Sequence, residues 1–80
     1  MGKTNLLIAE WKAGASLIIL GINAVDKDSK QIIKNLARNQ LNMLWETRPN
    51  KNLPLEEQVN QDQKELIDYL TKVAETGEIE

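Results

Sequence analysis

Apolar residues recur at helical spacing over the first quarter of the chain, from about Thr4 to Ile22. At 100° per residue they form two neighbouring stripes. The first stripe contains Leu7, Trp11, Ala15, Ile18 and Ile22, and the second contains Leu6, Ala13, Leu17 and Leu20. The only aligned polar positions are Asn5, Lys12, Ser16 and Asn23. We therefore predict a helix over about 4–24, with Thr4 placed to cap it, that is apolar over most of its circumference.

A second helical pattern covers about residues 28–48 and is the clearest in the chain. Its apolar face contains Ile32, Ile33, Leu36, Ala37, Met43 and Leu44, together with Gln40. Asp28 followed by Gln31 resembles a capping box at the start. Arg48 precedes Pro49, and a residue before proline is disfavoured in helical geometry, so the helix is expected to stop there.

A third helix is predicted over about 54–76, beginning at Pro54, a residue that suits the first helical position. Val59, Leu66 and Val73 recur every seven residues, with Leu70 between them. Between Glu56 and Glu65 only Val59 is apolar, so we expect the first half either to form on packing or to fray. Gly77 is placed to cap the C-terminal end.

These patterns predict an all-α protein, a compact three-helix unit forming a single domain over 1–80, with 77–80 as a short acidic tail. An alternative remains for the segment 16–25, which is rich in β-branched and aliphatic residues. Short apolar runs of this kind are also typical of strands, and a strand there would give an α+β fold.

The small size of the chain favours association. A core built from 80 residues is marginal, and small domains supplement it with disulfides, metals or oligomerisation. The chain has no cysteine and no histidine, so oligomerisation is the route left open. Two short helices would not cover the apolar circumference of the first one. We therefore expect a helical homodimer, or docking on another protein, through Leu7, Trp11, Ile18 and Ile22.

Charge is distributed unevenly along a chain whose net charge is −2. Residues 27–51 carry six basic and two acidic side chains, whereas residues 52–80 carry two basic and eight acidic ones. The simplest interpretation places the acidic third helix beside the basic second helix, where the charges set orientation. Alternatively, Lys30, Lys34 and Arg38 could contact nucleic-acid phosphates as a small regulator would, although the net negative charge opposes that attraction.

The composition excludes most catalytic chemistry. Without histidine or cysteine the chain lacks the commonest general base, the thiol nucleophile and most zinc ligands. No serine, threonine or tyrosine has a candidate base partner, so we predict no enzyme, no cofactor and no metal site. A third functional alternative is an acidic decoy or inhibitor that occupies a basic site through Glu56, Glu57, Asp62, Glu65 and Asp68.

No segment predicts membrane insertion, because the apolar run from Leu6 to Ile22 is short for a span and contains Glu10 and Lys12. The absence of cysteine is compatible with a reducing compartment, so a cytoplasmic location is expected. The leading prediction is a non-catalytic protein-interaction module, such as an assembly, adaptor or regulatory subunit. It would act by burying an apolar helical face against a partner or against itself.

Overall fold

The computed structural model describes residues 5–22 and 26–79, and this part of the chain is helical with no strand. Helix α1 covers Leu6–Ile22, α2 covers Asp26–Glu46, a short 3-10 helix η1 covers Leu55–Gln58, and α3 covers Gln61–Thr76. The predicted all-α class is confirmed. The alternative strand is wrong for residues 16–22, which lie in α1, and its last three residues fall outside the described ranges.

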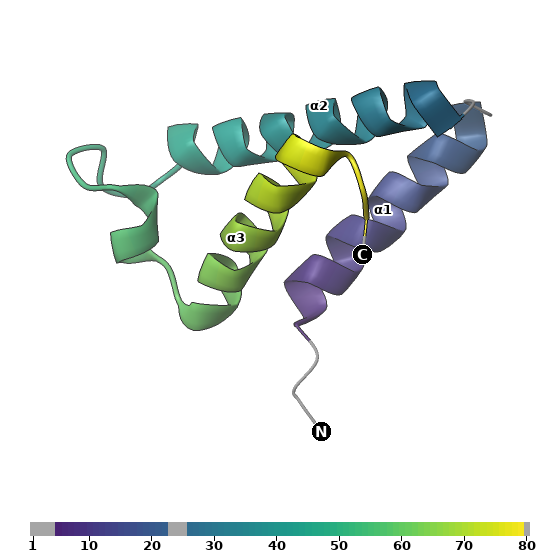
Figure 1. Ribbon diagram of the computed structural model, residues 1–80. Coiled ribbons are helices and arrows are strands. Elements are labelled where there is room, and N and C mark those ends of the chain that lie inside the picture. Colours follow the sequence, from purple (N-terminus) through teal and green to yellow (C-terminus); the bar gives the residue numbers. More distant parts are fainter. Residues whose placement is uncertain (1–4, 23–25, 80) are drawn as a thin grey trace.

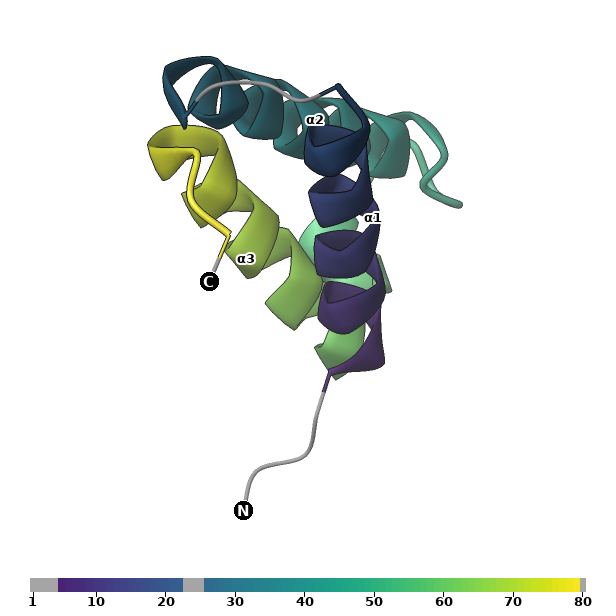
Figure 2. The same cartoon turned by 90° about the vertical axis from the view of Figure 1, so that its right-hand side faces the viewer.

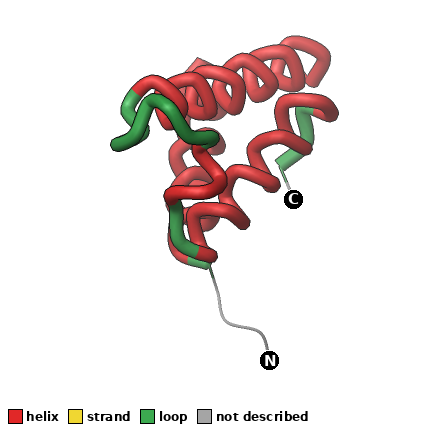
Figure 3. Tube along the Cα trace, turned by 90° about the vertical axis from the view of Figure 1, so that its left-hand side faces the viewer, coloured by secondary structure: helices red, strands yellow, loops and turns green. Residues whose placement is uncertain are grey.

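The three helices form a flat unit with principal extents of 40 × 33 × 19 Å. Its thickness matches two layers of helix, each about 10 Å across. In Figure 1, α2 runs along the top, α3 crosses beneath it, and α1 descends from the N-terminal end of α2. Figure 3 shows that the remaining described chain consists mainly of the α2–α3 connection and the turn after α3.

The core lies between α2 and α3. Its buried members are Ile33 and Ala37 from α2 and Leu66, Leu70 and Val73 from α3. Leu70 and Val73 are the largest fully buried side chains of the described residues. The sequence placed both on the apolar face of the third helix. Because these two helices build the core, α1 lies at the edge of the core. Ala15 is the buried residue of α1.

Helix α1 is attached mainly at its N-terminal end. The side-chain oxygen of Asn5 accepts hydrogen bonds from the backbone N–H groups of Leu7 at 3.0 Å and Ile8 at 3.3 Å, which caps the helix. The amide nitrogen of Asn5 donates to the backbone carbonyl of Asp62 at 2.9 Å. The cap is therefore Asn5 rather than the predicted Thr4, which lies outside the described residues.

From this joint, α1 and α3 diverge toward their C-terminal ends, as both Figure 1 and Figure 2 show. Toward the C-terminal end of α1, Leu20 and Ile22 are 76% and 51% exposed.

Two predictions about α2 need correction. The helix begins at Asp26, so Asp28 lies inside its first turn and does not cap it. Instead of forming a capping box, Gln31 donates to the side chain of Asn35 at 3.2 Å. At the other end the helix stops at Glu46, two residues before the predicted end.

Arg48 organises the turn that follows α2. Its guanidinium group donates to the backbone carbonyls of Trp45, of Lys51 at 2.8 Å and of Leu53 at 3.0 Å. It also lies 4.5 Å from the centre of the Trp45 ring, the cation–π contact that their spacing of three residues allows. One side chain thus closes the end of the helix and fixes the loop.

The predicted single helix over 54–76 is wrong in its first part. The chain forms η1 at Leu55–Gln58, then becomes extended at Val59 and Asn60 before α3 begins. Asn60 and Gln63 form a capping box, with the Asn60 oxygen accepting from Gln63 N at 2.9 Å. Such a box starts a new helix and competes with continuation of the previous one. Leu55, buried in η1, anchors the short turn.

The end of α3 agrees with the sequence. Gly77 adopts a left-handed conformation with φ of 72°, and its N–H donates to the carbonyl of Val73 at 2.7 Å. The predicted glycine cap is confirmed. Beyond it, Ile79 packs against the core and Glu78 lies 3.5 Å from the ammonium group of Lys30. The segment predicted as an acidic tail therefore returns to the helices as far as Ile79.

Candidate interaction surface

Helix α1 presents a line of exposed apolar residues on the side away from α3. We call this line the outer stripe and define it as Leu6, Ala9, Ala13, Leu17 and Leu20, all of them exposed. Leu6 and Leu17 are each 68% exposed and Leu20 is 76% exposed. In Figure 2 no other element lies in front of this side of α1.

Two polar residues, Asn5 and Lys12, contact α3, whereas Glu10 and Ser16 of α1 are exposed. Asn5 bonds to α3 through the Asp62 carbonyl and also donates to Oε1 of Glu65 at 3.1 Å. Seven residues further along the chain, the ammonium nitrogen of Lys12 lies 5.9 Å from the centre of the Tyr69 ring of α3. Beside these contacts, the apolar residues Leu7, Ile8, Trp11 and Ile19 pack against the core. Because α1 is apolar on nearly all sides, the outer stripe is left uncovered.

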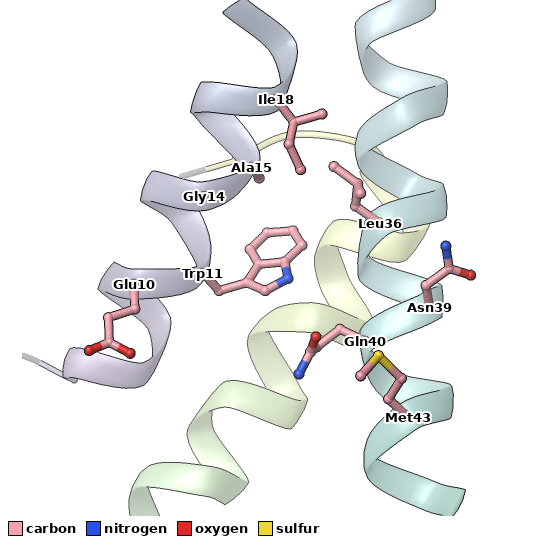
Figure 4. Close-up of a pocket in the computed structure, with 9 residues that line it drawn as sticks. All are labelled: Glu10, Trp11, Gly14, Ala15, Ile18, Leu36, Asn39, Gln40 and Met43. Carbon is pink, nitrogen blue, oxygen red and sulfur yellow. The ribbon is translucent and has the colours of Figure 1, made fainter. Parts of the chain in front are cut away.

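A second apolar feature adjoins this surface, a groove of about 380 Å³ between α1 and α2. Figure 4 shows Trp11 and Ile18 reaching toward Leu36, Gln40 and Met43 of α2, while Glu10 lies on the outer side of α1. The lining is mostly apolar, and Met43, on its rim, is 59% exposed. The groove and the outer stripe together make most of one side of α1 apolar.

The structure divides the four residues predicted for the interface into two pairs. Leu7 and Trp11 are half-buried and pack against the core of the same chain. Trp11 makes an edge-to-face contact with Tyr69, with ring centres 5.9 Å apart and an angle of 76°. Ile18 and Ile22 are 44% and 51% exposed, because they lie on the part of α1 that diverges from α3.

The sequence shows both apolar stripes of α1, but the predicted interface residues all came from the first stripe. Both stripes are apolar, so their periodicity alone does not say which of them faces the core. The informative signal is the polar strip that contains Asn5 and Lys12, to which the sequence analysis assigned no orientation. Met43 was also assigned to the packed face of α2, and the structure leaves it at the rim of the groove.

The three basic residues of the nucleic-acid alternative do not form one free cluster. Lys30 is ion-paired with Glu78, with both side chains more than half exposed. Lys34 is half-buried and Arg38 is exposed. The close packing of α2 on α3 brings the basic and acidic segments together within one chain, as the simplest interpretation of the charge pattern expected.

The acidic residues of the decoy alternative lie on two elements. Glu56 and Glu57 are exposed in η1, whereas Asp62, Glu65 and Asp68 follow one another along α3. Glu65 uses both carboxylate oxygens within the chain, accepting from Asn5 at 3.1 Å and from Gln61 at 3.4 Å. Part of this charge is therefore engaged in holding α1 and α3 together.

Neither a metal centre nor a membrane span is found over residues 5–22 and 26–79. No group of three or more acidic, histidine or cysteine side chains is placed to hold a metal ion. None of the helices there has the length and apolar character needed to cross a bilayer. Comparison with protein-family models, curated proteins and solved structures found no match to this chain.

Proposed function

We propose that this chain is a non-catalytic protein-interaction module, an assembly, adaptor or regulatory subunit that acts by burying the exposed apolar side of α1 against another helical surface. The observation that carries the proposal is the exposed outer stripe of α1. Leu17 and Leu20 point into solvent, while the side chains of Asn5 and Lys12 contact α3. Contiguous exposed apolar surface on a small protein is characteristic of sites for protein–protein contact.

The magnitude of this exposure is compatible with association. The exposed fractions of Leu6, Leu17, Ile18, Leu20, Ile22 and Met43 add up to roughly three and a half whole side chains. Complete cover is worth about 1.5–3 kcal/mol for each whole side chain, hence at most about 5–11 kcal/mol per chain. When two such surfaces meet, the gain of about 10–20 kcal/mol opposes an association cost of about 4–15 kcal/mol. Net binding in the micromolar range, near −8 kcal/mol, lies inside these limits.

Sedimentation velocity between about 1 and 100 µM tests the proposal, because that range brackets the affinity expected above. The wild-type chain should associate reversibly, and its dissociation constant should change little between low and high salt, since the face carries no charge pair. Leu20→Asp should remain folded and lose the association. A wild-type chain that stays monomeric over the whole range would contradict the proposal.

The nucleic-acid alternative receives less support. It relies on Lys30, Lys34 and Arg38, of which Lys30 is already paired with Glu78 and Lys34 is half-buried. Few counterions would be released on binding, so affinity would be weak and strongly dependent on salt. A gel-shift titration of the wild type against the triple alanine variant tests it, and binding that rises as salt falls and disappears in the variant would favour this alternative.

A further inference from the structure

We propose that the partner of this surface is a second copy of the chain, whose α1 packs antiparallel against α1 of the first copy along the outer stripe. The twofold axis of the resulting dimer passes beside Ala13. This inference rests on the proposed interaction function and names its partner and its geometry. It follows from the spacing, the side-chain sizes and the exposure of the five stripe residues.

The spacing of the outer stripe is symmetric about Ala13. The positions 6, 9, 13, 17 and 20 are separated by three, four, four and three residues. Reading the stripe from either end gives the same intervals, which is what an antiparallel pair of identical helices requires. The intervals of seven from Leu6 to Ala13 and from Ala13 to Leu20 also match the seam of two packed helices.

Side-chain size is complementary in the same register. Leu6 lies opposite Leu20 of the partner subunit, Leu17 lies opposite Ala9 of the partner subunit, and Ala13 meets its own copy. Large residues thus face small ones around the centre, and the two leucine pairs close the ends. A parallel arrangement would place leucine on leucine at positions 6, 17 and 20 and alanine on alanine at positions 9 and 13. It would leave a gap at the two alanine pairs, which costs packing contacts.

Electrostatics and shape favour the same arrangement. None of the five stripe residues is charged, and the exposed Glu10 lies beside the stripe, so the centre of the contact between two copies buries no ion. Antiparallel helices also place opposite ends of their dipoles side by side. The outer side of α1 is unobstructed along its length in Figure 2, so a second helix can lie on it without displacing α2 or α3.

The chain exposes more surface than a compact monomer of its mass. Its total is 5767 Å², whereas a compact monomer of 9.1 kDa exposes about 4,900 Å². The surplus is spread over the whole chain, and the three leucines of the outer stripe, 68% to 76% exposed, contribute to it. A second copy on the stripe would cover these leucines.

Cysteine cross-linking tests the register, and the chain is suited to it because it contains no native cysteine. A disulfide requires Cα atoms within about 4.4–6.8 Å of each other. Ala13→Cys should form a disulfide-linked dimer under mild oxidation. Leu6→Cys alone should not, since the two copies of residue 6 lie about 21 Å apart along antiparallel helices. A mixture of Leu6→Cys with Leu20→Cys should give mixed dimers.

Each other outcome has a definite meaning when the oxidised and reduced samples are also sedimented. Self-linking of Leu6→Cys as efficiently as Ala13→Cys would show a parallel pair and overturn the antiparallel geometry. If the chain sediments as a dimer but none of these cysteines forms a disulfide across it, the outer stripe is not the interface. The proposed interaction function would still hold in that case. Monomers under all conditions would overturn both proposals.

A polar substitution with a matched control adds a readout independent of disulfide chemistry. Leu17→Asn should weaken dimerisation at least tenfold while helix content and melting of the diluted monomer stay unchanged. Leu53→Asn is the control, because Leu53 is an exposed leucine in the loop between α2 and η1, away from α1. It should change the dissociation constant less than twofold. Equal effects of the two substitutions would contradict the assignment.

Discussion

Replacing Gly77 is the substitution for which the structure predicts the largest loss of stability. It caps α3 in the left-handed region, with φ of 72°, and a Cβ built on it would lie 2.7 Å from the carbonyl oxygen of Lys30. An L-residue in that conformation costs about 1–2 kcal/mol. Forcing the neighbouring backbone to move adds about 1–3 kcal/mol. Gly77→Ala should therefore destabilise the fold by about 3 kcal/mol.

This loss is large for a chain of 80 residues, whose total stability is expected to be roughly 4–12 kcal/mol. It corresponds to a fall in Tm of about 12–24 °C, measured by circular dichroism at a fixed low concentration. Gly77→Asn should fall between alanine and wild type, because asparagine tolerates the left-handed conformation but still carries a Cβ.

Gly14→Ala is the matched control, since Gly14 is exposed within α1 and its Cβ would meet no atom within 4 Å. Alanine there should raise stability by about 1 kcal/mol through helix propensity. Opposite signs for the two glycines are the expected result. Melting of Gly77→Ala within 2 °C of wild type would refute the cap and the close approach to Lys30 together.

Four further substitutions test how the helices are held. Asn5→Ala removes both the cap of α1 and its bonds to α3, so it should cost about 1–2 kcal/mol in a urea titration, with an unchanged m-value. Trp11→Ala removes a half-buried aromatic side chain from the core edge and should cost about 2–3 kcal/mol in the same titration, whereas Ile18→Ala should cost less than about 1 kcal/mol. Lys30→Gln breaks an exposed ion pair with Glu78 and should change the free energy of unfolding by less than about 0.5 kcal/mol at any salt concentration.

The helices and most of the core could be predicted from the sequence because their signals are local. Leu66, Leu70 and Val73 form one face of α3 by spacing alone, and Gly77 marks its end. The break before α3 was missed because Pro54 is an equally good helix start. Asn60 and Gln63, which form the capping box, carry the signal that separates η1 from α3.

The orientation of α1 could not be predicted in the same way. A helix that is apolar on nearly all sides has no unique inward face, so its rotation is decided by the neighbours it meets. Here the decision comes from Asn5, which binds the backbone carbonyl of Asp62 in the first turn of α3, and from Lys12, which lies over Tyr69. Both contacts join residues more than fifty positions apart, and no local pattern encodes them.

This division of roles implies that folding and association depend on different sides of α1. The core between α2 and α3 needs only the inner side of α1, where Trp11 meets Tyr69. A partner on the outer stripe adds contacts to Leu17 and Leu20 without touching that core. Truncating Trp11 should therefore weaken folding and, by loosening α1, association as well. Truncating Leu17 should weaken association alone, since its side chain contributes little to the isolated fold.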